Sequence, residues 1–258
     1  MIDIGKLYCG GSSTGDGLRY GQEAGPDCHG NSPHKVQKLA SGRRPIVVWN
    51  TTRTCNLHCV HCYTDSDNLK YDGELTTDEA FKLIDELSDF GIPSLLFSGG
   101  EPFMRKDLFT LLEYAAKKNV RPVISTNGTL IDRETAQRVK DSGVVYVGIS
   151  LDGLEEINDK FRGVQGAFTR TMKGFDNCRA VNQRVGLRLT LTERNYLDLH
   201  GIFNFIEKEQ INRACFYHLV YSGRGSAISK DDLTHTESRK AMDIILERTK
   251  DYFDRNLD

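Results

Sequence analysis

Apolar and polar residues follow two alternating periods along most of the chain, which indicates strands followed by helices. Short apolar runs typical of buried strands precede longer stretches in which apolar residues recur every three or four positions. The expected strands are 46–50, 94–97, 122–126, 144–151, 186–192 and 214–220. The expected helices are 77–90, 107–118, 132–142, 167–181, 197–210 and 236–253.

Strands that alternate with helices of this length favour βαβ units and a parallel sheet. The pattern therefore predicts an α/β fold for residues 45–258, a partial (β/α)6 barrel with one strand and one helix per unit. Residues 1–44 have no clear period and are rich in glycine, so we expect an irregular N-terminal extension there.

Composition narrows the classes of function. The net charge of −2 gives no general attraction to nucleic acid or to an anionic membrane. No apolar run approaches the ~20 residues that span a bilayer, and the first residues do not open a signal peptide. We therefore expect a cytoplasmic protein with no nucleic-acid partner and no membrane. The seven cysteines are odd in number and clustered, which points to metal binding or catalysis and not to a disulfide framework.

The strongest chemical signal is the spacing C-x3-C-x2-C, formed by Cys55, Cys59 and Cys62 directly after the first expected strand. Thiolates are soft ligands that suit iron–sulfur clusters, zinc and copper(I). A four-iron cluster that only transfers electrons takes four protein thiolates, so three leave one iron open, as in a catalytic site. A zinc site of these cysteines with His58 or His61, or a fourth cysteine from elsewhere, stays open as an alternative.

Polar and glycine-rich motifs follow the other expected strands. They are SGGEP at 98–102, STNG at 125–128, SLDG at 150–153, the polar positions Arg188, Thr190 and Thr192, and SGRG at 222–225. Parallel α/β sheets bind ligands at the carboxyl ends of their strands. Because the motifs stand at consecutive strand ends, we expect them to share one site with the cysteines.

The three cysteines, followed by the aromatic Tyr63, resemble the signature loop of the radical S-adenosylmethionine (SAM) superfamily. The resemblance implies that the thiolates hold a [4Fe–4S] cluster and that the amino and carboxylate groups of SAM chelate its fourth iron. The reduced cluster then cleaves SAM to methionine and a 5′-deoxyadenosyl radical, which abstracts hydrogen from a substrate. The partial barrel is also the fold that this superfamily implies.

The resemblance further implies a SAM site, with no catalytic side chain beyond the cluster and SAM. The GGEP stretch resembles a motif whose backbone binds the SAM ammonium group, where glycines permit a close backbone approach. Ser125 and Asn127 resemble positions that bind the ribose and methionine, and Arg162 resembles one that reaches the SAM carboxylate. The full implied set is Gly99, Gly100, Glu101, Pro102, Ser125, Asn127, Ser150, Asp152, Arg162, Thr190 and Thr192.

The stretches KLYCG at 6–10, LRYG at 18–21 and PIVVWNTTR at 45–53 narrow the resemblance to radical SAM enzymes of the sirohaem-dependent haem pathway and the haem d1 branch. The type it most resembles, 12,18-didecarboxysirohaem deacetylase, removes acetate side chains to give iron-coproporphyrin III. A flavodoxin or ferredoxin would supply electrons. Arginines match carboxylates, so hypothetical tetrapyrrole contacts are Arg19, Arg43, Arg44 and Arg224, with His29 or His34 as a ligand to the substrate iron.

One departure concerns the C-terminal region. Enzymes of this type continue into a cysteine-rich region with an auxiliary [4Fe–4S] cluster, whereas this sequence ends at Asp258 without one. We expect a shortened chain that lacks the auxiliary-cluster region. Two alternatives stay open: a radical SAM maturase of a peptide or protein, and a non-catalytic zinc- or cluster-binding module.

Overall fold

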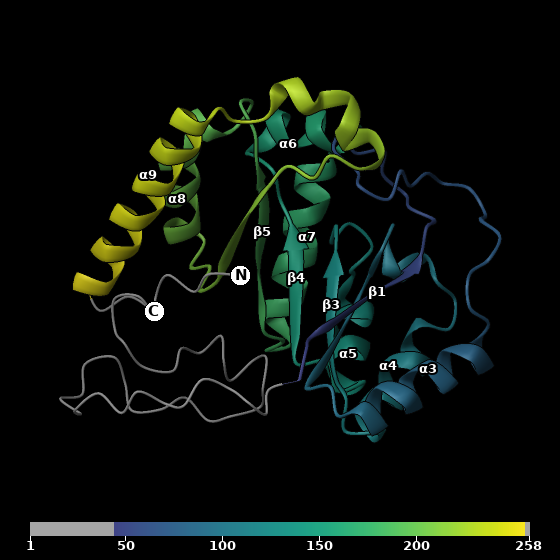
Figure 1. The fold of residues 1–258 in the computed structure, drawn as a ribbon. Coiled ribbons are helices and arrows are strands. Elements are labelled where there is room, and N and C mark those ends of the chain that lie inside the picture. The colour runs from purple at the N-terminus through teal and green to yellow at the C-terminus, as the bar shows by residue number, and fades with distance from the viewer. Residues whose placement is uncertain (1–43, 256–258) are drawn as a thin grey trace.

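The computed structural model describes residues 44–255 (Figure 1). A single sheet of six parallel strands runs in chain order from β1 to β6. Within this part of the chain β1 and β6 are edge strands, so the sheet stays open and the predicted partial barrel is confirmed. The strands are β1 Val47–Thr52, β2 Ser94–Gly99, β3 Arg121–Thr126, β4 Tyr146–Ser150, β5 Val185–Leu191 and β6 Ala214–His218.

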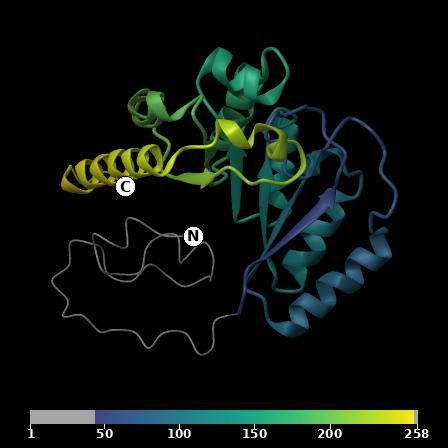
Figure 2. The ribbon, with the colours of Figure 1, turned by 45° about the horizontal axis from the view of Figure 1, so that its top comes forward.

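Helices connect the strands, as the alternation predicted. Figure 1 shows α7 behind β4, and both views show α9 beside α8, on which it packs (Figures 1 and 2). The α-helices are α3 Thr77–Phe90, α4 Leu108–Lys117, α5 Arg133–Asp141, α6 Glu155–Arg162, α7 Ala167–Ala180, α8 Leu199–Lys208 and α9 His235–Asp254. Shorter 3-10 segments are η1 Pro102–Met104, η2 Tyr196–Asp198 and η3 Gly223–Asp231. Among the described residues no helix is long and apolar enough to cross a membrane.

Local sequence explains where α3 begins and ends. The Thr76 side chain accepts a hydrogen bond from Glu79 N, and the Glu79 carboxylate accepts one from Thr76 N at 2.8 Å. This reciprocal capping satisfies amides that have no partner inside the helix. The helix ends at Gly91, whose φ of 81° is the left-handed conformation that glycine adopts at little cost. The sequence prediction for this helix is therefore confirmed at both ends.

Two of the α-helices differ from the sequence prediction. The helix expected over 197–210 begins as η2 and becomes regular only in α8. Helix α6 was not predicted, because only Ile157 and Phe161 give its eight residues an apolar face. Its stability comes from tertiary packing, since Phe161 is 1% exposed.

Strand β5 shows how the sheet separates the core from the inside of the barrel. Leu187, Leu189 and Leu191 are buried in the main hydrophobic core. Arg188 and Thr190, at the alternate positions, line a cavity on the inner face of the sheet. Alternation with period two thus places polar side chains of β5 where a ligand would lie.

Candidate active site

A cavity of about 350 Å³ lies inside the barrel at the carboxyl ends of the strands. The three thiols of Cys55, Cys59 and Cys62 line it, together with residues from every strand. The structure thus brings together residues that range from Val48 to Val220 in the sequence, as the strand-end motifs predicted. From the predicted SAM-binding set, the lining includes Gly99, Gly100, Ser125, Asn127, Ser150, Asp152, Arg162 and Thr190. The lining does not include Glu101, Pro102 and Thr192.

Each of the three thiols receives an N–H group, which is the environment that iron–sulfur ligands use to stabilise charge on sulfur. None of the described cysteines forms a disulfide. The donors are Leu57 N to Cys55 Sγ at 3.4 Å, Arg162 Nη1 to Cys59 Sγ at 3.7 Å and Ser66 N to Cys62 Sγ at 3.4 Å. Three free thiols around one cavity, each with a donor, fit a cluster held by three thiolates.

The thiols differ in how easily they ionise. Burial raises the pKa of Cys55 to about 12, and burial also raises the pKa of Cys59 against the charge of Arg162. At Cys62 burial acts in the same direction, but hydrogen bonds from Thr64 and Ser66 outweigh it and lower the pKa. Metal ligands must be deprotonated, so iron would have to hold Cys55 and Cys59 as thiolates. Within residues 44–255, no group of three His, Cys, Asp or Glu side chains is placed for a single metal ion.

The glycine pair at the carboxyl end of β2 contacts the start of the cysteine loop, the segment 53–66 that carries the three cysteines. Gly100 N donates to Thr52 O at 2.7 Å, and Glu101 N donates to Thr54 O at 2.9 Å. A Cβ atom on Gly100 would lie 2.4 Å from Thr54 O, so no other residue fits there without displacing backbone. The close approach expected at this motif therefore includes contact with the chain that leads into Cys55.

Glu101 is fully buried and supports the end of β3. Its carboxylate accepts hydrogen bonds from Thr126 Oγ1 and Asn127 N, each at 2.8 Å, and from Phe103 N at 3.2 Å. Burial raises the pKa of Glu101 to about 7, although these donors favour the charged form. The side chain therefore positions Asn127, which does line the cavity.

Asp152 joins the end of β4 to the cysteine loop. Its buried carboxylate pairs with the guanidinium of Arg162 and lies 3.2 Å from His61 Nε2. It also accepts a hydrogen bond from Thr190 N at 2.8 Å. Burial favours the neutral acid, but the charges of Arg162 and His61 outweigh it and lower the pKa of Asp152. Arg162 also donates a hydrogen bond to Cys59 Sγ, so Asp152, Arg162 and Cys59 form one network of polar contacts.

The end of helix α6 is hydrogen-bonded to the backbone of the cysteine loop. His58 N donates to Arg162 O at 3.2 Å, and Val60 N donates to Phe161 O at 2.9 Å. Gly163 ends the helix with φ 67°, and a Cβ atom there would lie 2.3 Å from His58 O. In the sequence, the Arg-Gly pair at 162–163 is the signal for this helix end, because glycine is the usual residue just after a helix.

Arg224, in the 3-10 segment η3, also binds the cysteine loop. Its guanidinium donates to Cys59 O and Ser66 O, each at 2.8 Å, and pairs with Asp65 Oδ1 at 2.9 Å. Its backbone N donates to Cys62 O at 2.9 Å. We therefore assign Arg224 to loop support in place of the tetrapyrrole contact that the sequence suggested.

Arg44, another contact that the sequence suggested, does not line the cavity. Arg44 lies just before β1, at the amino end of the strand, with its guanidinium 4.9 Å from the ring centre of Phe90. This is the end of β1 opposite to the cysteine loop, so Arg44 does not fit a contact in this cavity. The remaining candidates fall outside the described residues: Arg19, His29, His34 and Arg43.

Replacing Arg224 with methionine is expected to lower the free energy of unfolding by about 2–4 kcal/mol, because two loop carbonyls lose a charged donor. Less iron should also remain bound after reconstitution. Chemical denaturation and iron analysis measure the two effects. Arg239→Met is the control, since Arg239 is exposed on α9 and, within residues 44–255, pairs only with Asp243 one turn away. Equal stability and iron content in both variants would contradict the supporting role.

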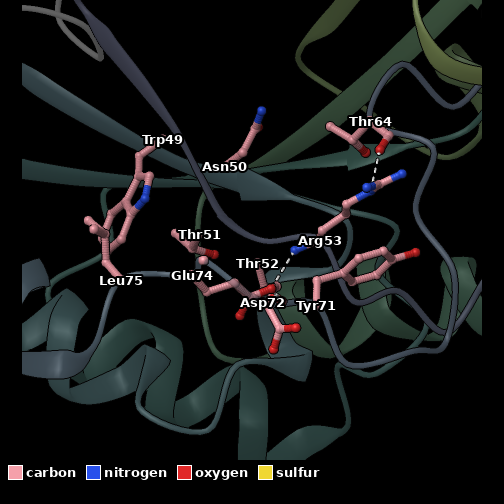
Figure 3. A pocket seen from close by; sticks show the side chains of 11 residues that line it. Trp49, Asn50, Thr51, Thr52, Arg53, Thr64, Tyr71, Asp72, Glu74 and Leu75 are labelled. Carbon is pink, nitrogen blue, oxygen red and sulfur yellow. Dashed lines mark hydrogen bonds between the residues drawn. The ribbon is translucent and has the colours of Figure 1, made fainter.

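A second cavity of about 430 Å³ borders β1 and the segment 71–75 (Figure 3). Its polar side chains bond to the base of the cysteine loop. Glu74 accepts hydrogen bonds from Thr52 Oγ1 and Arg53 N, each at 2.8 Å, and Arg53 Nε donates to Thr64 O at 2.9 Å. These hydrogen bonds connect Arg53, before the three cysteines, with Thr64, after them, and Glu74 links the same segment to Thr52 of β1.

Residues 49–206 match the family described as the Radical SAM superfamily. The chain belongs to this superfamily. It is 51% identical over 250 residues to the Fe-coproporphyrin III synthase of Methanosarcina barkeri, in an alignment that covers 97% of this chain and 61% of that protein. It is 41% identical over 212 residues to the pre-heme d1 synthase of Dinoroseobacter shibae, in an alignment that covers 82% of this chain and 52% of that protein. The chain therefore spans 52–61% of the length of these curated relatives.

The fold agrees with solved structures. The chain is similar to SuiB of Streptococcus suis bound to S-adenosylmethionine, with a TM-score of 0.67 and 19% identity over 81% of this chain and 48% of that one. Membership of the superfamily brings a [4Fe–4S] cluster and SAM as cofactors, which the predicted cysteine loop fits. The predicted membership of the radical SAM superfamily is confirmed, and the zinc-module alternative is set aside.

Proposed function

We propose that the chain is the barrel of a radical SAM enzyme that removes acetate side chains from 12,18-didecarboxysirohaem to give iron-coproporphyrin III. The observation that carries this proposal is the 51% identity, over nearly the whole chain, to a relative named Fe-coproporphyrin III synthase. Identity to a pre-heme d1 synthase supports a modified tetrapyrrole as the substrate class. The relatives are longer, so the proposal includes an auxiliary [4Fe–4S] cluster in a further part of the whole protein.

In this proposal Cys55, Cys59 and Cys62 hold the cluster. The remaining cavity walls would hold SAM, and the backbone of Gly99 and Gly100 would bind its ammonium group. Arg162 would bind the SAM carboxylate, a role supported by its burial, its charge and its contact with Cys59 Sγ. The hydrogen-bonding groups for the rest of SAM are Ser125, Asn127, Ser150 and Thr190. When bound, these cofactors supply one-electron cleavage of SAM and hydrogen abstraction from the substrate.

The proposal also names an electron source and a compartment. A low-potential donor such as a flavodoxin or ferredoxin would reduce the cluster. A cytoplasmic setting suits this chemistry, because thiols such as the unpaired Cys55, Cys59 and Cys62 stay reduced there.

One anaerobic incubation tests the proposal. Reconstituted protein is mixed with SAM, a strong reductant and 12,18-didecarboxysirohaem, and mass spectrometry follows 5′-deoxyadenosine and the pigment together. We expect deoxyadenosine and a pigment lighter by its acetate groups. Deoxyadenosine with unchanged pigment, from a sample that also binds no tetrapyrrole, would overturn the substrate assignment and favour the alternative of a peptide or protein maturase.

A further inference from the structure

Arg188 lines the cavity but has no role in the site described so far. It lies on β5, in register with Ser150 of β4 and Cys215 of β6. Its neighbours Leu187 and Leu189 are buried in the core, so alternation directs Arg188 to the inside of the barrel. In the sequence Arg188 is one of the polar positions of this strand, and the sequence indicates no ligand for it.

Two neighbours fix the position of the Arg188 side chain. Gly148, on the adjacent strand β4, leaves room for its stem, because a Cβ atom there would lie 2.7 Å from Arg188 Cδ. The guanidinium lies over the ring of Tyr217, with 4.9 Å between its carbon and the ring centre. An arginine stacked in this way keeps its planar N–H edge available for a ligand.

The charge of Arg188 is not balanced within residues 44–255. Arg162 pairs with Asp152, and Arg224 pairs with Asp65, but no carboxylate forms an ion pair with Arg188 in this part of the chain. The side chain is half-buried, so its desolvation is not fully offset by water. A cationic fork inside a binding cavity without a protein counter-ion is suited to a carboxylate of the ligand.

The cavity mouth indicates which ligand carries that carboxylate. Val48 on β1 and Val220 after β6 line the cavity and are 56% and 55% exposed, so apolar surface flanks the gap between the two edge strands. A flat apolar ring system with carboxylate side chains matches both this surface and Arg188. The SAM carboxylate is a weaker match, because Arg162 already lies beside the cysteine loop.

We propose that Arg188, stacked on Tyr217, binds a side-chain carboxylate of the tetrapyrrole and so orients the pigment toward the three cysteines. This inference rests on the proposed function and adds a specificity-determining residue to it. The bidentate geometry of a guanidinium fixes both the position and the rotation of a carboxylate. Orientation of this kind decides which side chain of the macrocycle faces the radical.

Equilibrium binding tests the inference without relying on turnover. Cluster-loaded protein is titrated with 12,18-didecarboxysirohaem, followed by absorbance, and separately with SAM. Arg188→Gln is expected to weaken tetrapyrrole binding by about 10- to 100-fold, the range for a lost hydrogen bond to a charged group. SAM affinity should change less than about twofold, within the effect of a substitution away from the SAM site. Arg188→Lys should recover part of the loss, because it keeps the charge without the fork.

Arg184→Gln is the matched control, since Arg184 precedes the same strand, carries the same charge and is exposed. It should bind tetrapyrrole as the parent does. Unchanged tetrapyrrole affinity in Arg188→Gln would overturn the inference while leaving the proposed function intact, and a loss confined to SAM affinity would reassign Arg188 to the cofactor. Failure of the parent protein to bind tetrapyrrole would overturn the proposed function itself.

Discussion

Replacing Cys59 with alanine is expected to remove the cluster and to reduce SAM cleavage to the level of a cluster-free sample. Cys59 is the middle one of the three cysteines in the sequence. It lines the cavity, and its Sγ accepts a hydrogen bond from the Arg162 guanidinium. Two thiolates cannot hold a four-iron cluster with a single open iron. Iron and acid-labile sulfide analysis measures the first loss, and the amount of 5′-deoxyadenosine formed with SAM and reductant measures the second.

Cys178→Ala provides the control for this substitution. Cys178 is fully buried in α7, where burial alone raises the pKa of its thiol to about 12. Its removal should cost about 1 kcal/mol of stability through a small cavity. Iron content and deoxyadenosine formation should stay at the parent level. A Cys59→Ala protein that still formed deoxyadenosine at the parent rate would show that these cysteines are not the cluster ligands.

The strand ends could be predicted from the sequence because local patterns determine them. A short apolar run sets each strand, and the polar or glycine-rich residues that follow must lie at its carboxyl end. In a parallel sheet all these ends lie along one edge, so the sequence alone is enough to assign Cys55, Gly99, Asn127 and Asp152 to one site, and all four line the cavity. Their meeting depends on topology, which the alternation of elements already indicates.

The partners inside the site could not be predicted, because they depend on contacts between distant residues. Arg224 is 159 residues from Asp65, and nothing near it in the sequence indicates that it binds the cysteine loop. Arg188 resembles any polar strand residue until Gly148 and Tyr217 are placed beside it. Residue type indicates that an arginine can bind a carboxylate, but only the packing distinguishes Arg224, which pairs with Asp65, from Arg188, which has no ion-pair partner within residues 44–255.

Replacing Asp152 with asparagine is expected to lower the free energy of unfolding by about 3–5 kcal/mol. The change leaves the Arg162 guanidinium, which is 6% exposed, without its counter-ion. Because the ion pair lowers the pKa of Asp152, the parent keeps this contribution above the unfolded-state pKa of about 4 and loses it as the pH falls further. The variant should therefore lose stability at neutral pH and converge on the parent in acid. Urea denaturation at several pH values measures both effects.

The double variant Asp152→Asn/Arg162→Met separates a lost ion pair from a general defect. It removes the uncompensated charge, so it should be more stable than the sum of the single losses predicts, by about 0.5–3 kcal/mol. Asp176→Asn is the surface control, because Asp176 is 60% exposed where it pairs with Arg179. It should unfold like the parent at every pH. Strict additivity in the double variant would mean that Asp152 and Arg162 act independently, and the network that links β4 to Cys59 would not exist in solution.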